Sequence, residues 1–277
     1  MRLHKAAVRF DDSVLHDAYT GHFIGKGQLD PTDIFKLDGA SVRRRILSVS
    51  PDVAIPARRA ARLGAEVYLF GEASPDEWNG APIRVKYVLH QTPGRAKVFT
   101  FAEALRGQPG REMYASREWN KDVPDNQASS RYFNDYHIFV AASEPLAPFD
   151  LIFIDDQWHI CHAVHPSLSG FKDAVSHEIT GMVFEYAEIG VRKYDPVTDD
   201  WDATHADVMV LRLRWQEQYD YLRASQENYQ RGDETLVIAD EGYRPKPSDG
   251  ILLSDGRWRI LASQEGAGVW LLHARRD

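Results

Sequence analysis

Two segments about one hundred residues apart share one pattern: a strand-like run, a tight acidic turn and a second strand-like run that contains Trp. They read IFIDDQWHIC over 152–161 and LSDGRWRIL over 253–261. When Trp158 is placed over Trp258, the other pairs are Asp155 with Asp255, Ile160 with Ile260, and Cys161 with Leu261. A repeat constrains the fold more than any single motif, because each copy then belongs to one structural unit.

The similarity extends upstream of both segments. The run HIFVA over 137–141 corresponds to TLVIA over 235–239, and a Pro-containing link that ends in Asp150 or Asp249 follows each run. We interpret the copies as a duplicated unit of about one hundred residues, a common domain size. The alternative is that β-hairpins with Asp-Gly turns resemble one another by chance.

Weaker similarities extend the repeat further. Segments 84–101 and 181–197 both read as strand, turn and strand, at an offset of 97 residues. A third copy is indicated in 34–49, where Asp38-Gly39 precedes a run with Arg-Ile-Leu, as Asp255-Gly256 does near the C-terminus.

The turn signals and residue types indicate a mainly β protein. Asn-Gly and Asp-Gly pairs favour tight hairpins, and the segments between them are rich in β-branched and aromatic residues. The sequence therefore predicts tandem small β-barrel or β-sandwich domains with one or two short helices. The predicted units are 1–80, a β-rich domain with a short helix near 56–63, then 81–180 and 181–277, each a β-barrel-like repeat.

Helical and loop signals are few. Pro56 and Gly64 frame the helix predicted at 56–63, because Pro suits a first helical position and Gly a stop. The polar segment 216–231 is predicted as a second helix or a long ordered loop. Segment 107–130 is rich in turn formers and is predicted as an extended loop whose conformation depends on a partner.

Composition limits the classes of protein that the chain can represent. Its 277 residues are 43% hydrophobic, which suffices for a good core, and its single cysteine excludes an intrachain disulfide. No apolar run is long enough for a transmembrane helix, and the first residues lack the apolar core of a signal peptide. The net charge of −8 disfavours a broad nucleic-acid-binding surface, although an acidic wall lets a DNA duplex slide past.

The segment 159–165 carries His159, Cys161, His162 and His165, side chains that suit a transition metal. In a strand, however, His159 and Cys161 lie on one face and His162 on the other, so the set does not converge on one ion. We assign Cys161 to the core and the histidines to surface or interface positions. A metal-dependent hydrolase that uses this cluster is the rival hypothesis.

Other candidate motifs are incomplete. The pair His177-Glu178 lacks the second histidine of a zinc-protease helix, because Gly181 stands in its place. The glycines of 21–27 are spaced too closely for a phosphate-binding loop. We predict no catalytic, cofactor-binding or metal-binding residue and no enzymatic activity.

The predicted contact residues are mostly arginines, which are favoured in interfaces. Alternation along the last repeat places Trp258 and Ile260 in the core and directs the neighbouring side chains to a second, covered face. The candidate interface residues are Arg43, Arg44, Arg45, Arg58, Arg59, Arg62, Arg259 and Leu261.

The order of features over 181–277 resembles the small β-barrel head-closure, or head–tail adaptor, proteins of tailed bacteriophages, which form the neck or connector. The residues that carry the resemblance are Pro245, Pro247, Asp249, the turn Asp255-Gly256 and Trp258. It covers the last hundred residues well, the preceding hundred loosely and the first eighty hardly at all. The chain is two to three times longer than a single closure domain of that family.

The resemblance implies a structural virion protein that forms a homo-oligomeric ring at the head-to-tail junction, as a stopper, adaptor or collar. The implied partners are the portal or adaptor and the tail proteins, with non-specific contact to packaged DNA in the lumen and no membrane partner. The implied location is the virion, after assembly in the host cytoplasm. A tail-tube, baseplate or capsid-decoration protein is the alternative within the virion.

Overall fold

The computed structural model describes most of the chain. The described residues are 13–30, 36–37, 40–41, 44–92, 94–119, 135–166, 170–190, 204–215, 230, 232–240, 242–266 and 268–277. The predicted helix or loop at 216–231 falls almost entirely outside these ranges, as do residues 120–130 of the predicted loop.

The described strands form three closed six-stranded barrels, so the prediction of a mainly β chain of tandem small barrels is confirmed. The first barrel consists of β1 (Ser13–Asp17), β2 (Phe23–Leu29), β5 (Arg44–Val49), β6 (Ala60–Leu63), β7 (Glu66–Trp78) and β8 (Ala81–Thr92). The short strands β3 (Lys36–Leu37) and β4 (Ala40–Ser41) pair only with each other in the described part of the chain.

The second and third barrels share one long strand. The second consists of β9 (Gly94–Phe99), β10 (Arg111–Trp119), β11 (Asp135–Ala141), β12 (Leu151–Ile154), β13 (Gln157–Pro166) and β14 (Phe171–Gly190). The third consists of β14 again, β15 (Thr204–Trp215), β16 (Glu234–Ala239), β17 (Gly250–Leu253), β18 (Gly256–Gly266) and β19 (Val269–Arg276).

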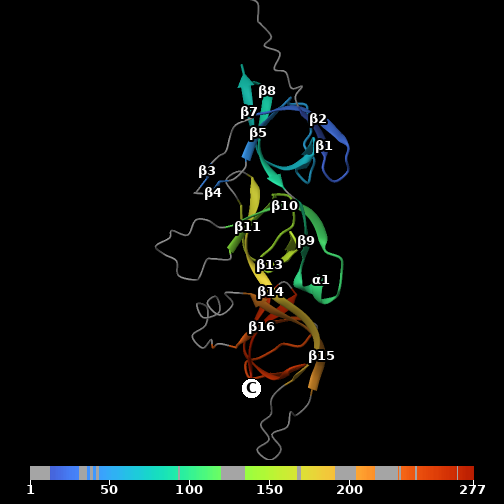
Figure 1. The fold of residues 1–277 in the computed structure, drawn as a ribbon, viewed down its shortest axis with the longest axis vertical. Helices are drawn as coiled ribbons and strands as arrows, with labels where there is room; N and C mark the ends of the chain where they lie inside the picture. The colour runs from blue at the N-terminus through green and yellow to red at the C-terminus, as the bar shows by residue number, and fades with distance from the viewer. Residues whose placement is uncertain are drawn as a thin grey trace, which may run out of the picture.

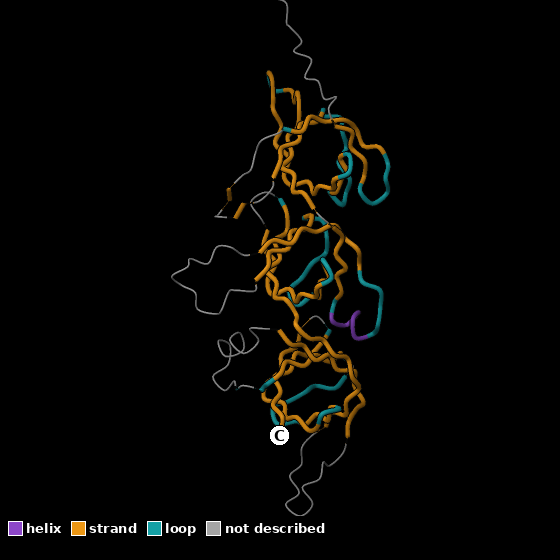
Figure 2. Tube along the Cα trace, in the orientation of Figure 1, coloured by secondary structure: helices purple, strands orange, loops and turns teal. Residues whose placement is uncertain are grey.

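All three barrels have the same strand connections. If the strands of each barrel are numbered one to six along the chain, strand one pairs with two and four, three pairs with two and six, and five pairs with four and six. All these pairs are antiparallel. Figures 1 and 2 show the barrels as three ring outlines in a row, and the strand β14 runs from the second ring into the third.

Local geometry repeats as well as topology. In each barrel, strand four spans four residues and a two-residue turn leads into strand five. Strand five then carries a register shift at the same place, after Phe70, Cys161 or Ile260. A β-bulge bends the strand, and the curvature helps a six-stranded sheet to close.

This register corrects the alignment of the two Trp residues. The carbonyls of Cys161 and Ile260 each accept a backbone hydrogen bond of 2.7 Å from the residue before the Asp that ends the link, Phe149 or Ser248. The structural counterpart of Cys161 is therefore Ile260 rather than Leu261, and Trp258 corresponds to His159. The sequence alignment was wrong by one residue because it matched the two Trp residues, although Trp258 points into its barrel and Trp158 points outward.

The inward side of each barrel is filled with apolar side chains, so the barrels are packed cores rather than pores. Trp258 and Ile260 are 3% and 0% exposed in the core of the third barrel, as the alternation predicted. Trp158 faces outward and packs against Phe99 and Phe153.

Three local predictions differ from the structure. Residues 60–63 form strand β6, not the end of a helix, because Gly64 supplies the tight turn to β7 rather than a helix stop. Residues 111–119 of the predicted loop form strand β10, whose inward residues Met113 and Ala115 are fully buried. The one helix in the described chain is α1 (Phe101–Leu105), which begins at the capping box of Thr100 and Glu103.

The expected domain limits also differ from the barrels. A limit at 80 separates β7 from β8, although these strands form one hairpin of the first barrel. A limit at 180 lies inside β14, which pairs with β13 up to Glu178 and with β15 from Ile179. The inward residues of β14 change from even-numbered, such as Ala174 in the second barrel, to odd-numbered, such as Ala187 in the third, with a register shift between Ile179 and Gly181.

The weaker sequence repeats do not match the strand equivalence. Arg45-Ile-Leu lies in β5, a third strand, whereas Arg259-Ile-Leu lies in β18, a fifth strand. The first barrel is nevertheless a third copy of the unit by topology. Of the segments at an offset of 97 residues, 191–197 lies outside the described residues.

Candidate functional site: the joints, mouths and free ends of the barrel row

The joint between the first and second barrels contains a buried network around Glu144, which is 5% exposed. The Arg58 Nε donates to Glu144 Oε1 at 2.8 Å, and the Tyr19 hydroxyl donates to the same oxygen at 2.9 Å. The guanidinium of Arg58 lies 3.5 Å from the centre of the Tyr19 ring. Burial, with Glu144 close by, raises the pKa of Tyr19, so its hydroxyl remains a donor.

Apolar side chains and close backbone contact surround this network. His90, from β8 of the first barrel, packs against Phe139 and Phe171 of the second, at ring-centroid distances of 4.9 and 5.8 Å. A Cβ on Gly170 would lie 2.6 Å from the backbone nitrogen of Glu72, so the two barrels touch through their main chains. These contacts fix the two barrels to each other.

The joint between the second and third barrels is larger and apolar. Helix α1 packs on β15 and β16, and the cluster joins side chains of both barrels. Its buried members are Phe101, Leu105, Leu151, Ile160, Ile179, Leu211, Leu213, Val237 and Val269. The strand β14 also passes through this joint, so the second and third barrels share a strand as well as an apolar cluster.

The mouth of the third barrel is closed by a charged cluster around Arg212, whose side chain is 8% exposed. Its guanidinium donates to Glu234 at 2.7 Å, to Glu185 at 3.1 Å and to Asp255 at 3.1 Å. It also lies 5.1 Å from the centre of the Trp258 ring. Although burial opposes the cation, the hydrogen bonds to Asp255 and Glu234 raise the pKa of Arg212.

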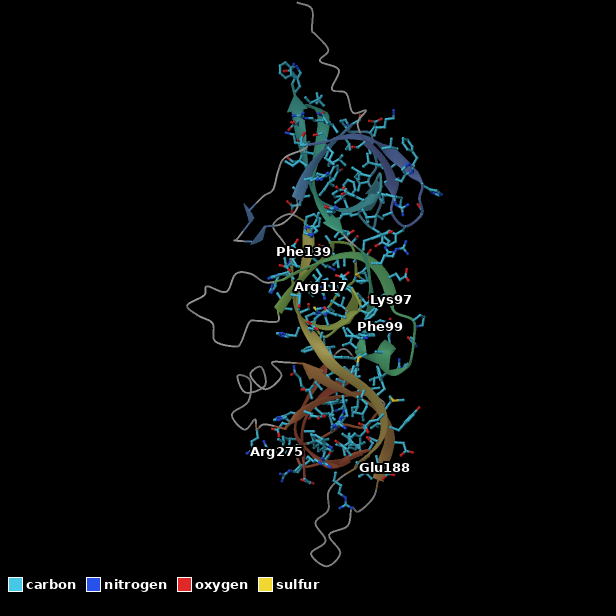
Figure 3. The ribbon with its side chains drawn as sticks, viewed as in Figure 1. Lys97, Phe99, Arg117, Phe139, Glu188 and Arg275 are labelled. Carbon is cyan, nitrogen blue, oxygen red and sulfur yellow. The ribbon has the colours of Figure 1, made fainter. Side chains whose placement is uncertain are left out.

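The second barrel has an arginine at the equivalent position of its second strand. Arg117 donates to Gln157, lies 3.3 Å from His159 Nε2 and sits 5.0 Å from the Tyr136 ring centre. Figure 3 shows Arg117 within the ring outline of the second barrel. The partner at the fifth strand is His159 here and Trp258 in the third barrel.

The first barrel repeats the arrangement from another strand. Arg45, on β5, lies 5.9 Å from the centre of the Tyr68 ring, and Tyr68 occupies the position of His159 and Trp258. The Tyr68 hydroxyl donates to Glu66, and burial raises the pKa of Tyr68 to about 12. An arginine on a ring therefore recurs at one mouth of every barrel, which suits a structural plug better than a substrate site.

The histidine cluster does not form a metal site in the described part of the chain. His159 is fully buried, and burial, with the Arg117 guanidinium and His177 nearby, lowers the pKa of His159 to about 3. Burial raises the pKa of the Cys161 thiol to about 12, so it stays protonated, and His165 is exposed. The side chain of His162 is not among those described.

The predicted interface arginines are scattered in the structure. Arg58 forms a joint, but between two barrels of one chain rather than with a neighbouring subunit. Arg45 lies at a barrel mouth, Arg59 donates to the carbonyl of Gly71 at 3.3 Å, and Arg62 is exposed. Arg43 and the side chain of Arg44 lie outside what the structure describes.

Arg259 and Leu261 lie on β18, in the terminal barrel. The Arg259 Nε is 3.7 Å from an Asp277 carboxylate oxygen, and both Arg259 and Leu261 are half-buried. No other barrel of the described chain covers the side of β18 to which Arg259 points.

Sequence reasoning missed Tyr19, Glu144, Arg117 and Arg212. A sequence signal existed for Arg212. The inward residues of β15 are Val208, Val210 and then Arg212, so a charged side chain follows two apolar ones on the same face of the strand. Tyr19 and Glu144 meet only because two barrels dock, and no local pattern indicates that contact.

Exposed large apolar side chains gather in the two terminal barrels of the described chain. In the first barrel they are Val14, Phe23, Trp78 and Ile83, and in the third they are Val183, Phe184, Tyr186 and Leu252. Trp78 and Tyr186 are the most exposed of them, at 63% and 76%. Contiguous apolar groups indicate a contact surface, and Trp78 and Ile83 lie on either side of the single turn between β7 and β8.

No protein-family model, curated protein or solved structure matches the chain. The described residues include no grouping of three or more His, Cys, Asp or Glu side chains fit to hold a metal ion. Within the same residues, no helix has the length and apolar character needed to cross a bilayer.

Proposed function

We propose that the chain is a non-enzymatic structural protein of a tailed-phage virion. In this proposal it forms a homo-oligomeric ring at the head-to-tail junction, as a stopper, adaptor or collar between the portal and the tail. It assembles in the host cytoplasm, becomes part of the virion and lies beside the packaged DNA in the lumen.

The observation that carries the proposal is the architecture: three barrels of one topology, held in a row by buried joints. The third barrel spans the segment that resembles the head-closure family, and the two other barrels repeat its strand connections. A rigid row of small barrels suits a component that must hold its shape under load, because its packed interiors resist deformation.

Charge supports the placement beside DNA. The net charge of −8 makes the surface repel phosphates on average, which suits a wall that DNA passes without being retained. Non-specific DNA binding by the purified protein should therefore be weak at physiological salt.

The rival reading as a metal-dependent hydrolase has less support. His159 is directed inward next to the Arg117 cation, and a neighbouring positive charge disfavours binding of a divalent ion. A tail-tube, baseplate or decoration protein stays open as another place in the virion, since the same rigid row would serve there.

The test is to find the chain in particles. Purified virions of the phage that encodes it should contain the chain in a fixed copy number by quantitative mass spectrometry. Cryo-electron microscopy should then place three barrels per copy in a ring between the portal and the tail. Absence of the chain from purified virions would refute the proposal, and a position in the tail tube, baseplate or capsid shell would select the alternative.

A further inference from the structure

Both joints use the same sides of the barrel, so the contact between barrels is directional. The earlier barrel contributes its fourth and fifth strands, through Ala60 and Leu69 at the first joint and through Leu151 and Ile160 at the second. These residues occupy equivalent positions, because Ala60 pairs with Leu69 as Leu151 pairs with Ile160. We call this side the outgoing face.

The later barrel contributes its second, third and sixth strands, which we call the incoming face. At the first joint these residues include Tyr114, Ala141 and Phe171, and at the second they include Leu211, Val237 and Val269. The hairpin between strands five and six takes part each time, because Phe171 and Val269 both lie where the sixth strand begins.

Among the described residues, one outgoing face and one incoming face have no partner barrel. The outgoing face of the third barrel carries Leu252 and Arg257, which pair across β17 and β18, and Arg259 in the place of Ile160. Tyr186 lies two residues before Glu188, which pairs with Leu252. Figure 3 shows Glu188 at the end of the row that is farthest from the first barrel.

The free incoming face belongs to the first barrel, and its hairpin extends past the end of the row. Figure 1 shows β7 and β8 reaching away from the second barrel. The tip is a tight turn at Asn79 and Gly80, both with positive φ, and it presents Trp78 and Ile83 at 63% and 50% exposure. Asp76 pairs with Arg84 and Lys86, which stiffens the hairpin.

We propose that copies of this chain associate head to tail, with the outgoing face of the third barrel docked on the incoming face and the β7–β8 hairpin of a second copy's first barrel. The contact continues, between chains, the interface that the chain already uses twice within itself. This inference deepens the proposed function and rests on it in one respect. A head-to-tail contact can produce either a closed ring or an open filament, and the proposed function requires the ring.

The side chains at the two free faces set the strength of this contact. Both faces are more polar than the joints: Arg259 replaces Ile160 on the outgoing face, and the exposed Lys26 of β2 stands on the incoming face where β10 has Tyr114. A polar outer face keeps a terminal repeat soluble. The contact between copies is therefore reversible, dependent on concentration and weaker at high salt, unlike the permanent joints.

The test uses two variants that each disable one end. The first carries Trp78→Asp and Ile83→Asp on the hairpin, and the second carries Tyr186→Asp and Leu252→Asp on the third barrel. Sedimentation velocity and native mass spectrometry of the full chain should give oligomers for the unchanged protein. Each variant alone should be monomeric, with an apparent Kd for self-association raised at least about 100-fold.

An equimolar mixture of the two variants distinguishes a directional contact from a symmetric one. Each variant keeps one intact end, so the mixture should form a one-to-one heterodimer and nothing larger. Val14→Asp, at an apolar side chain that is 42% exposed on β1, a strand that belongs to neither face, is the matched control and should associate like the unchanged protein.

Several outcomes would overturn the inference: an unchanged protein that stays monomeric at all concentrations, a single variant that still self-associates, or a mixture that stays monomeric although both variants fold.

Circular dichroism reports the folding of each variant. If either fails to fold, Ile83→Cys and Leu252→Cys replace them, and oxidation should link the two chains in a mixture more than either chain to itself. A chain found in virions without this contact would refute the inference and leave the proposed function intact.

Discussion

Removal of the Arg212 cation is expected to destabilise the third barrel severely. The change Arg212→Leu leaves Glu185 and Glu234 with side chains only 10% and 11% exposed and without the cation that joins them. Loss of one partner of a buried ion pair costs about 3–5 kcal/mol. Asp255 adds little to this loss, because its side chain is 36% exposed.

The equivalent change in the second barrel provides the matched control. Arg117→Leu removes a hydrogen bond to Gln157 and a contact with neutral His159, and its nearest carboxylate, Asp155, is 3.5 Å away and 42% exposed. We expect a loss of about 1.5–3 kcal/mol, the range for one hydrogen bond to a charged group. The same position in the repeat thus carries different costs, because the partners differ.

The assay is urea unfolding followed by circular dichroism, with hydrogen exchange of β16 and β18 as a local readout. The deficit of Arg212→Leu should persist from pH 7 to about 4.5, the ordinary pKa of a Glu carboxyl, and should shrink as the pH falls further. Contacts with Ser254 and Arg212 keep the pKa of Glu185 low against burial, so its stabilisation in the unchanged protein is present above the ordinary pKa and is lost on acidification. A loss under about 1 kcal/mol, or a deficit that pH does not alter, would refute the reasoning.

Three further predictions concern single residues. The pKa of His159 is about 3 in the folded chain and 6.5 in the unfolded chain, so His159 lowers the free energy of unfolding below pH 6.5. Between pH 7 and pH 5, the free energy of unfolding should therefore fall by about 2 kcal/mol less in His159→Gln than in the unchanged chain, as urea titrations would measure. Gly170→Ala places a Cβ against the Glu72 backbone at φ +78, so we expect a loss of about 2 kcal/mol and faster hydrogen exchange at the first joint; an unchanged melting curve would contradict it. Thr100→Ala removes the cap of α1 and should cost about 1 kcal/mol in thermal unfolding, whereas Thr100→Ser should cost less.

The fold class could be predicted from local sequence because its signals are local. Tight turns such as Asn79-Gly80 need residues that accept positive φ, and Trp258 and Ile260 alternate with outward side chains as a half-buried strand requires. The repeat was visible for the same reason, since each copy reuses one turn and one Asp-ended link.

The remaining features depend on contacts between distant residues. The shared strand β14 and the network of Arg58, Tyr19 and Glu144 arise only when whole barrels dock. The helix predicted near 56–63 was wrong because Pro56 and Gly64 mark turns as well as helix ends, and the pairing of Ala60 with Leu69 decides between them. The capping box of α1 is a local signal that sequence reasoning passed over.

The central claim is that the second and third barrels are one body through the unbroken strand β14. Hydrogen exchange measured by mass spectrometry on overlapping peptides from 171–190 tests it directly. We expect slow exchange through Glu178 and Ile179, where the pairing passes from β13 to β15, as slow as in the flanking parts of the strand. Fast exchange confined to this point, with slow exchange on either side, would contradict the claim and indicate two independent barrels.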